Sequence, residues 1–542
     1  MNNAIYNFNL PQNEAVMEYK KGSPERLQLD KELERQLQNP VEIPLIIGGK
    51  EVFTGKTGEI RMPHKHAHVL ATYQVASDRE VEMAIDAALS AHKIWSNLSW
   101  TVRASVMLKA AELISGKYRQ LLNAATMLGQ SKNIFQSEID VVCETTDFLK
   151  YNTYFASRIY EMQPQSAFNQ LNRMEFRPLE GFVFTVSPFN FTSIASNLNM
   201  APVMMGNTTV WKPATTSMLS NYYLMKIFQE AGLPDGVINF IPGSGAAIGK
   251  KVLQSPHLAG IHFTGSNQTF NSLWQQVASQ LPLYVSYPRL VGETGGKNFM
   301  FVHPTASAIE VAVNAYRGAF EYQGQKCSAV SRMYVPESLW PAIKNELTRI
   351  SHDVKMGDVT DPLNFVNAVI DEKSFDNIMS YITYAKSSDE AVILAGGNGD
   401  KSTGYFVEPT IIVTTNPRFR TMEEEIFGPV LTIYVYKDEQ VSQTIDLCNT
   451  TSPYGLTGAV FARDRVAASE ICEQLRYSAG NFYINDKPTG AVVGMQPFGG
   501  SRASGTNDKA GGEFNLIRWI SPRTIKETFL PATEYRYPYM ME

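Results

Sequence analysis

Short apolar runs that alternate with helical segments constrain the fold of this chain most. In the first series the runs occupy residues 182–186, 208–211, 237–241 and 261–264. A second series has strand candidates at 299–302, 332–335, 430–436, 456–461 and 481–484. Alternation of strand and helix predicts right-handed crossovers and a parallel sheet. Because 542 residues far exceed the roughly 100–200 of one ordinary domain, we expect two α/β domains.

A helical layer is predicted before the first series. Ser77 and Glu80 have the spacing of a capping box, and the apolar residues that follow recur at helical spacing, which predicts a helix over 77–96. Amphipathic stretches at 100–130 and 136–158 continue the layer.

Three further segments lie outside these two patterns. An apolar run at 43–47, before a Gly-Gly pair, indicates a strand in an arm that leads into the fold. Residues 163–177 lack helical periodicity and are interpreted as an excursion, with a hairpin as one form that it could take. The β-rich tail at 517–529 is a candidate to pair with that excursion.

Polar motifs follow the strands of the first series, where parallel sheets bind ligands. Gly243, Gly245 and Gly249 approach a dinucleotide-binding fingerprint, although the last spacing is one residue too long. Glycines at this place let backbone N–H groups approach a pyrophosphate at a helix N-terminus, and Gly265 repeats the opportunity after the next strand. Ordinary turns are the alternative for each motif taken singly.

A thiol and a carboxylate indicate the chemistry. Cys327 lies 34 residues after Glu293 in the sequence. A thiolate adds readily to an aldehyde, and a carboxylate can activate water against the resulting thioester. The alternative for Cys327 is a buried structural thiol, which is the interpretation of the other three cysteines, Cys143, Cys448 and Cys472.

Composition and the chain ends argue against several classes of protein. The net charge of −5 gives no field that favours nucleic acid. The four cysteines have no metal-site spacing, so no metal is expected. No apolar run approaches the ~18 residues of a membrane span, and Met1 to Asn7 do not resemble a leader peptide. Reduced thiols then make a cytoplasmic location the expectation.

Seven motifs spread over residues 187–500 carry a family resemblance. They are Ser-Pro-Phe-Asn-Phe at 187–191, Trp-Lys-Pro at 211–213, Phe-Thr-Gly-Ser at 263–266, Glu-Thr-Gly-Gly-Lys at 293–297, Gly-Gln-Lys-Cys at 324–327, Glu-Ile-Phe-Gly-Pro at 425–429 and Pro-Phe-Gly-Gly at 497–500. The chain thereby resembles the aldehyde dehydrogenase superfamily. Within it, the segments 21–26, 187–192, 320–328, 480–487 and 503–509 are similar to the stand-alone Δ1-pyrroline-5-carboxylate dehydrogenases.

The resemblance implies an α/β fold with a Rossmann-type NAD-binding domain, an α/β catalytic domain and a small β oligomerisation flap. It implies five segments in chain order. They are an N-terminal arm and helical part of the NAD-binding domain (1–161), a β-hairpin excursion (162–180), the NAD-binding core (181–293), the catalytic domain (294–500) and a return segment with an oligomerisation strand (501–542).

The resemblance also assigns roles to residues. Cys327 would be the nucleophile, Glu293 the base for thioester hydrolysis and Asn190 an oxyanion donor together with the backbone N–H of Cys327. NAD is the implied cofactor, and its implied contacts are Ser187, Phe189, Lys212, Gly265, Ser266, Thr294, Glu425 and Phe427. Many superfamily members carry a glutamate two residues after the Lys-Pro pair, where this chain has Thr215, so strict preference for NAD over NADP does not follow from the motif.

A second set of residues would bind an α-amino acid end. It comprises Glu144, Phe191, Lys326, Ser328, Thr489, Gly490, Ala491 and Phe498. Converging N–H and O–H donors at 489–491 and Ser328 would hold a carboxylate, although Ala491 stands where related chains have serine. For Glu144 a solvated helix charge is the equal alternative.

The implied reaction is NAD-dependent oxidation of L-glutamate γ-semialdehyde, formed from Δ1-pyrroline-5-carboxylate, to L-glutamate in proline degradation. Oxidation of another semialdehyde, a thioesterase or esterase without redox chemistry, and a non-catalytic protein on the same scaffold are the alternatives. The implied partners are the small-molecule substrate, a second copy of the chain in a homodimer or larger oligomer, and a proline dehydrogenase, with no nucleic acid and no membrane.

Overall fold

The computed structural model describes residues 8–541, so the seven N-terminal residues on which the leader-peptide prediction rests lie outside the described range. Its first large sheet has seven strands in the order β11-β10-β7-β8-β9-β2-β3. The strands are β2 (Leu45–Ile47), β3 (Lys50–Val52), β7 (Phe182–Val186), β8 (Thr209–Lys212), β9 (Ile238–Phe240), β10 (Leu258–Thr264) and β11 (Arg289–Glu293). The five strands from β7 to β11 pair in parallel, as predicted from the first series.

The arm before this sheet contributes more than predicted. The run at 43–47 forms two strands, β1 (Val41–Ile43) and β2, with Pro44 between them. Proline supplies no backbone N–H to a ladder, so the chain changes sheets there. β1 pairs with β5 (Lys65–Gln74), which also pairs with β4 (Thr57–Met62), while β2 pairs antiparallel with β9.

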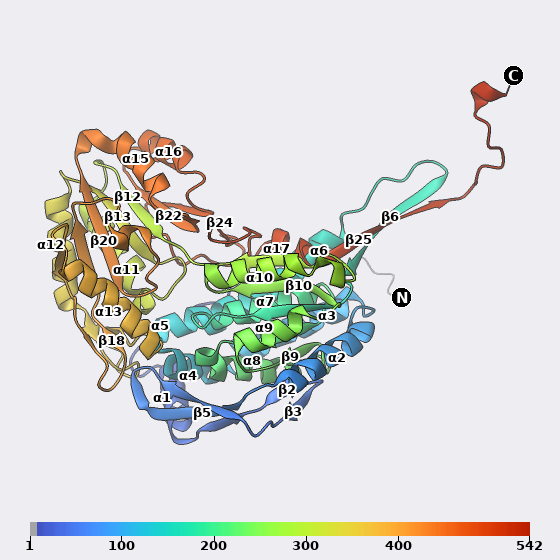
Figure 1. Cartoon of the computed structure of the whole chain (residues 1–542), viewed down its shortest axis with the longest axis horizontal. Helices are drawn as coiled ribbons and strands as arrows, with labels where there is room; N and C mark the ends of the chain where they lie inside the picture. The colour runs from blue at the N-terminus through green and yellow to red at the C-terminus, as the bar shows by residue number, and fades with distance from the viewer. Residues whose placement is uncertain (1–7, 542) are drawn as a thin grey trace.

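Helices cover both faces of the first sheet (Figure 1). They are α2 (Asp78–Trp95), α3 (Trp100–Ser115), α4 (Arg119–Gln130), α5 (Ile134–Ser137), a π-helix (Glu138–Glu144), α6 (Thr145–Tyr160), α7 (Thr192–Met204), α8 (Met218–Glu230), α9 (Gly245–Leu253), α10 (Asn267–Ser279) and α17 (Glu513–Ile517). The predicted helix at 77–96 is confirmed as α2, whose backbone N–H at Ser77 donates to Glu80 at 2.9 Å. Outside this layer, α1 (Pro24–Gln38) packs against α4.

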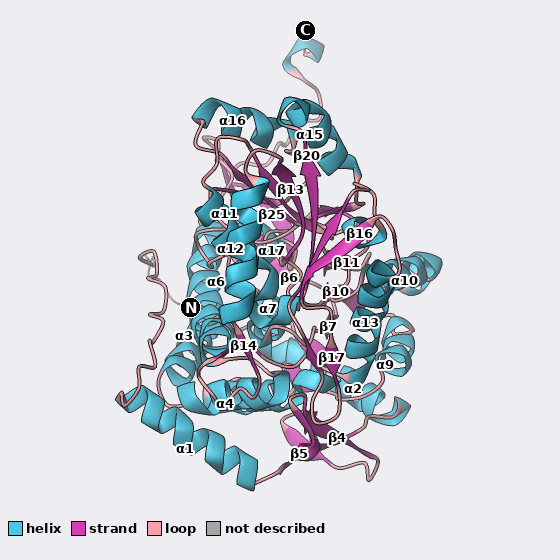
Figure 2. Ribbon diagram, turned by 90° about the vertical axis from the view of Figure 1, so that its left-hand side faces the viewer, coloured by secondary structure: helices cyan, strands magenta, loops and turns pink. Residues whose placement is uncertain are grey.

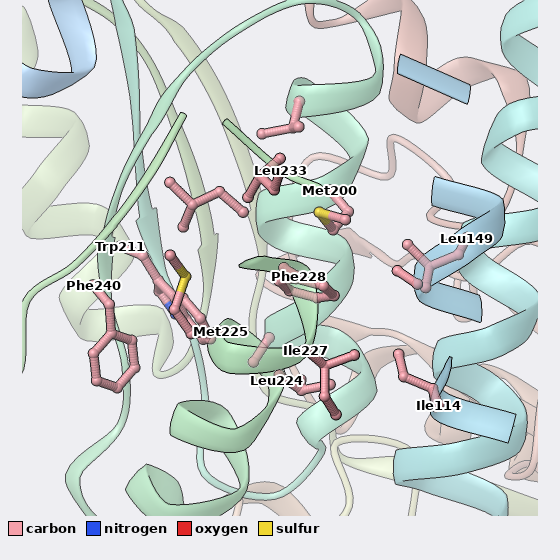
Figure 3. Packing of buried hydrophobic residues seen from close by; sticks show 14 of the residues in the cluster. Ile114, Leu149, Met200, Trp211, Leu224, Met225, Ile227, Phe228, Leu233 and Phe240 are labelled. Atoms are coloured by element: carbon pink, nitrogen blue, oxygen red, sulfur yellow. The ribbon is translucent and has the colours of Figure 1, made fainter. Parts of the chain in front are cut away.

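Alternate residues of the strands of the first sheet pack into two different hydrophobic cores. In β7, Val183 belongs to the larger cluster, while Phe182 and Phe184 belong to the cluster on the opposite face. This alternation is expected because successive side chains of a strand point to opposite faces. Figure 3 shows the larger core, where Trp211 and Phe240 from the sheet lie near residues of α8 such as Phe228.

The second large sheet has the order β16-β19-β20-β13-β12-β22-β23. Its strands are β12 (Asn298–Val302), β13 (Val330–Pro336), β16 (Ala391–Ala395), β19 (Thr410–Thr414), β20 (Val430–Tyr436), β22 (Thr457–Phe461) and β23 (Asn481–Ile484). All pairs are parallel except β16 with β19. Its helices are α11 (Ala308–Phe320), α12 (Trp340–Asp353), α13 (Glu372–Lys386), α14 (Arg420–Glu423), α15 (Val441–Thr450) and α16 (Arg465–Gln474). Figure 2 shows α15 and α16 at the end of the molecule opposite α1.

A two-stranded arm projects from the body. The tail strand β25 (Ile520–Thr528) pairs antiparallel with β6 (Gln170–Pro178) over nine register positions, and the two run outward together (Figure 1). The tail pairing is therefore confirmed, but the hairpin within 162–180 is wrong. The segment before β6 stays a loop, because it contacts β6 through side chains, as when the Gln163 amide bonds the backbone of Met174.

Candidate active site

A cavity of about 350 Å³ lies where residues of the two large sheets meet. Cys327 and Glu293 line it. So do all eight residues predicted to bind the substrate, namely Glu144, Phe191, Lys326, Ser328, Thr489, Gly490, Ala491 and Phe498. The fold thus gathers residues spread over more than three hundred sequence positions around a single space.

The thiol of Cys327 donates a hydrogen bond to the Glu293 carboxylate at 3.3 Å. Glu293 ends β11 in the first sheet, while Cys327 precedes β13 in the second. Burial raises the pKa of Glu293 to about 7. Burial, together with the Glu293 charge, raises the pKa of Cys327 well above its usual range. In the free protein the thiol therefore keeps its proton and faces a carboxyl group that is partly ionised near neutral pH and is placed to take that proton when the sulfur reacts.

A strained turn presents Cys327 to the cavity. Tyr322, Gln323 and Gly324 adopt φ values of 52°, 54° and 64°. Left-handed backbone at residues with a side chain costs about 1–3 kcal/mol each and persists only where surrounding contacts fix it. The buried Gln323 amide supplies such contacts, since it donates to the carbonyl oxygens of Ser131 at 3.0 Å and Ala368 at 2.8 Å.

Asn190 contacts the same turn. Its side-chain amide donates to the carbonyl oxygen of Gln325 at 3.1 Å. An amide NH₂ has two hydrogens, so this bond positions the group and leaves the other N–H for an oxyanion. Asn190 is buried beside the cavity but, unlike Cys327 and Glu293, does not line it.

The residues predicted for the amino acid end lie on several elements. The hydroxyls of Ser328 and Thr489 are 2.7 Å apart. The buried Lys326 ammonium donates to Glu321 at 3.2 Å. Gly490, which follows Thr489 in the loop after β23, has a φ of 89°. In this left-handed region glycine carries no steric cost.

Glu144 is part of the cavity wall, so its interpretation as a solvated helix charge is wrong. It ends the π-helix that precedes α6, and its carboxylate accepts a hydrogen bond from the Ser193 hydroxyl at 2.9 Å. Burial, followed by the neighbouring Asp140, raises the pKa of Glu144 to about 8. The group is therefore largely protonated near neutral pH in the free protein.

The residues predicted to contact a dinucleotide follow the first sheet. Lys212 ends β8, and a β-carbon on Gly245, the first residue of α9, would lie 3.8 Å from the Lys212 Cε. Ser266 caps α10 by accepting from the N–H of Thr269 at 3.3 Å, and Gly265 stands beside it. Among residues 8–541 no carboxylate pairs with Lys212, whose pKa burial lowers. Two helix N-termini and an unpaired ammonium suit an anionic pyrophosphate.

Glu425 and Phe427 lie on the other side of the site. The Glu425 carboxylate accepts from the N–H of Gly296 at 2.8 Å, and burial raises its pKa to about 7. Gly295 lets it approach, since a β-carbon there would lie 2.0 Å from the Glu425 oxygen. Phe427 has a left-handed φ of 59°, and its ring stands edge to face with Phe189 at 5.7 Å.

Two of the predicted cofactor contacts use their side chains within the protein. The Ser187 hydroxyl accepts from the Trp211 indole at 3.0 Å, and the Thr294 hydroxyl donates to the carbonyl oxygen of Ala503 at 2.5 Å. The Ser187 hydroxyl can still donate one hydrogen bond to a ligand, and the Thr294 hydroxyl can still accept one.

Most of the chain matches one known protein family. Residues 53–525 match the model of the aldehyde dehydrogenase family. This chain belongs to the aldehyde dehydrogenase family. The resemblance drawn from the seven motifs is confirmed, and so is the predicted fold class.

Several family members are similar along nearly the whole chain. A protein from Dictyostelium discoideum named Delta-1-pyrroline-5-carboxylate dehydrogenase, mitochondrial, is 48% identical over 99% of this chain and 97% of its own length. A probable delta-1-pyrroline-5-carboxylate dehydrogenase of Schizosaccharomyces pombe is 50% identical over 98% of each chain. The crystal structure of the Delta-pyrroline-5-carboxylate dehydrogenase from Mycobacterium tuberculosis bound with NAD superposes with a TM-score of 0.96, at 47% identity and 100% coverage of both chains.

The name of one of these relatives bears on the expected compartment. The Dictyostelium relative is named as mitochondrial, although it is similar to this chain over almost every residue. Unpaired cysteines do not distinguish the cytosol from the mitochondrial matrix, because both keep thiols reduced. The cytoplasmic prediction is therefore not supported. No helix within residues 8–541 has the length and apolarity needed to cross a bilayer.

Sequence reasoning missed a buried ion pair in this member of the family. The Lys132 ammonium donates to Asp140 at 2.6 Å, and both side chains are fully buried. The ammonium also lies 4.1 Å from the ring centroid of Phe191 and 4.6 Å from that of Tyr322. It thereby joins an aromatic wall of the cavity to the strained turn before Cys327.

Asp140 extends the same network. Its carboxylate accepts the N–H groups of Thr192 at 3.1 Å and Ser193 at 2.9 Å, at the start of α7. A second missed residue, Asn298, donates to the carbonyl oxygens of Cys327 at 2.7 Å and Ala329 at 2.9 Å. Its position just after the Glu-Thr-Gly-Gly-Lys motif was the available signal for Asn298, whereas no motif marked Lys132.

Proposed function

We propose that this protein oxidises L-glutamate γ-semialdehyde to L-glutamate with NAD as cofactor, the semialdehyde forming when Δ1-pyrroline-5-carboxylate opens by hydration. The observation that carries the proposal is the Cys327 thiol, 3.3 Å from Glu293, in one cavity with the residues predicted for an amino acid end. The relatives named as Δ1-pyrroline-5-carboxylate dehydrogenases, similar over 97–100% of both chains, support the substrate.

The residues present fit NAD. Lys212 and the N-termini of α9 and α10 would hold the pyrophosphate and adenosine ribose, and Glu425 and Phe427 would hold the nicotinamide ribose and ring. NAD, when bound, supplies the hydride acceptor for oxidation of the substrate carbon.

In the proposed mechanism Glu293 accepts the thiol proton, and the Cys327 sulfur adds to the aldehyde carbon. The Asn190 amide and the backbone N–H of Cys327 then stabilise the alkoxide; one such donor is worth about 3–4 kcal/mol. Loss of hydride from that carbon leaves a thioester on Cys327. Glu293 releases the thiol proton to solvent and then removes a proton from the water that attacks the thioester; the carbon–sulfur bond breaks, the Cys327 sulfur takes up that proton, and L-glutamate leaves.

The helices and strands also support a different role for each of the five chain segments. The segment 181–293 would form the core that binds NAD, supported by the arm and helices of 1–161, and the segment 294–500 would carry the nucleophile. The excursion 162–180 and the segment 501–542 form the β6–β25 arm, which supports a homodimer or larger oligomer because it projects apolar side chains such as Leu171 away from the body. Association with a proline dehydrogenase remains a prediction.

The test compares NADH formation from Δ1-pyrroline-5-carboxylate, succinate semialdehyde and propanal. We expect kcat/KM to favour the first by at least about a hundredfold, because a site built for polar groups rejects analogues that leave those groups unpaired. Cys327→Ser should lower the rate at least about a thousandfold, as loss of a catalytic nucleophile does.

Equal turnover of the three aldehydes would remove the substrate assignment, and equal rates in the wild type and Cys327→Ser would remove the mechanism. Cleavage of an ester substrate without any NADH formation would favour the thioesterase alternative.

A further inference from the structure

The N-terminal arm supplies part of the cavity wall. Asn13, Glu14 and Val16 line the same space as Cys327 and Glu293. They belong to a segment without regular secondary structure, residues 11–17, which is called the strap below. A segment this close to the N-terminus is held in place only by the contacts that it makes with the body.

Buried charges hold the strap on the body. Glu14 pairs with Arg119 at 3.0 Å and with Lys150 at 3.2 Å. Arg119 also donates to the carbonyl oxygen of Ala15 at 2.8 Å and forms a close ion pair with the fully buried Glu138. Glu138 in turn accepts the N–H of Met17 at 3.1 Å. Because the Arg119 and Glu138 charges are buried, they are costly to separate, and their bonds to residues 14, 15 and 17 anchor the strap to the body.

Within the strap, Asn13 joins two other walls of the cavity. Its amide nitrogen donates to the Asp147 carboxylate at 2.8 Å and to the carbonyl oxygen of Val493 at 2.8 Å. Its amide oxygen accepts from the Tyr151 hydroxyl at 3.1 Å. Asp147 and Tyr151 are on α6, whereas Val493 is on the loop after β23, so the amide nitrogen connects helix to loop while the amide oxygen binds the helix.

That loop carries the proposed anchor for the carboxylate, Thr489 to Ala491. Residues 489–493 of the loop pair with no strand, and Val493 packs on α6 against Phe148 and Tyr151. Gly494 lies so near Tyr151 that a β-carbon there would be 2.1 Å from the ring. These apolar contacts pack the loop against α6, and the hydrogen bonds of the Asn13 amide nitrogen connect the loop to α6 at the same place.

We propose that Asn13 is a specificity-determining residue. It holds the loop after β23 so that the backbone N–H groups near Gly490 converge on the substrate carboxylate, and semialdehydes with an α-amino acid end depend on these hydrogen bonds whereas plain aldehydes do not. The inference rests on the proposed function, because it assigns the loop to the amino acid end of that substrate.

The experiment compares three single variants of the full-length protein. Asn13→Asp keeps the shape but removes the N–H donors and places a second carboxylate against Asp147. Asn13→Ala removes the amide without adding charge. Gln12→Ala alters the neighbouring exposed side chain of the strap and is the matched control. For each, KM and kcat are measured with Δ1-pyrroline-5-carboxylate and with propanal, and L-glutamate binding is measured by calorimetry without NAD.

We expect both Asn13 variants to raise KM for Δ1-pyrroline-5-carboxylate and Kd for L-glutamate about tenfold, as loss of one or two hydrogen bonds would, with propanal kinetics and thermal midpoint close to wild type. Gln12→Ala should match the wild type throughout. Wild-type affinity for L-glutamate in both Asn13 variants would overturn the proposal, and so would an equal loss with both aldehydes.

Failure of the proposed function gives a different result. In that case the wild type itself would not bind L-glutamate and would not prefer Δ1-pyrroline-5-carboxylate to propanal, whatever residue stands at position 13.

Discussion

The Cys327 side of the site lies just before β13 and the Lys212 side lies at the end of β8, and the side chains on the two sides are held differently. On the Cys327 side, buried amides of Gln323, Asn190 and Asn298 bond to backbone carbonyl groups around the nucleophile. On the Lys212 side, the helix starts at Gly245 and Ser266 are exposed, and the lysine pairs with no carboxylate within the described chain.

This difference matches what each side has to do. A covalent step requires the sulfur, the base and the oxyanion donor to be held within a fraction of an ångström. A dinucleotide has to enter and leave in every turnover, so donors that await a ligand suit that side. Preorganisation is therefore concentrated where bonds form.

The largest effect is expected from Glu293→Gln. Glutamine keeps the size of the side chain but cannot accept a proton, so steady-state NADH formation should fall by about 10²–10⁴-fold. The raised pKa of Glu293, about 7, predicts that wild-type kcat falls as pH drops through about 7, because the base is lost on protonation. The pH profile of kcat checks this.

Glu144→Gln is the control for that profile, because it removes a second titratable acid from the same cavity. In this variant kcat should still fall as the pH drops through about 7, and the main change should be a higher KM. If kcat of Glu293→Gln still fell over the same pH range, the titrating group would be a residue other than Glu293.

The next effect concerns the stability of the Cys327 side. Lys132→Met should lower the free energy of unfolding by about 3–5 kcal/mol, because it leaves the Asp140 carboxylate buried and without its counter-charge. The exposed Lys401, which pairs with Glu372 and Asp376, provides the matched control, and Lys401→Met should leave the free energy of unfolding close to that of the wild type. Denaturant unfolding measures both, and similar losses in the two variants would contradict the importance of burial.

The smallest effect is expected on the Lys212 side. Lys212→Met should raise Kd for NAD about tenfold, the loss of one charged hydrogen bond, while kcat at saturating NAD changes little. Dinucleotide binding followed by protein fluorescence measures this, with the surface variant Lys226→Met on α8 as control. A collapse of kcat instead would show that this side is as preorganised as the other. The same titration with NADP tests whether Thr215 leaves room for a 2′-phosphate.

Local pattern predicted the strands well where hydrophobic burial alone defines them. The candidates at 430–436 and 481–484 have the same bounds as β20 and β23. The local pattern failed where the pairing partner sets the bounds of a strand. At 43–47 it predicted one strand instead of two, because β2 pairs with β9, nearly two hundred positions away. The hairpin expected at 162–180 failed for a related reason, since β6 found its partner in the distant tail.

The same distinction holds within the site. The thiol and carboxylate of Cys327 and Glu293 were predicted from their chemistry and from family motifs, and the residues of the amino acid end from resemblance to the family alone. Lys132 and Asp140 escaped prediction, because their pairing appears only when the π-helix and the Cys327 turn are brought together. Asn13 escaped for the same reason, since an asparagine in an irregular arm has no sequence signature.

By itself the sequence determined the parallel α/β sheets, because periodicity is a local property, and its family motifs marked a thiol, a carboxylate and a candidate dinucleotide site. Only the tertiary structure decided the 3.3 Å thiol–carboxylate contact, the raised pKa of Glu144 and the strap over the cavity. These depend on burial and on contacts between distant segments, and the free energy of a charge or a hydrogen bond is set by what surrounds it after folding.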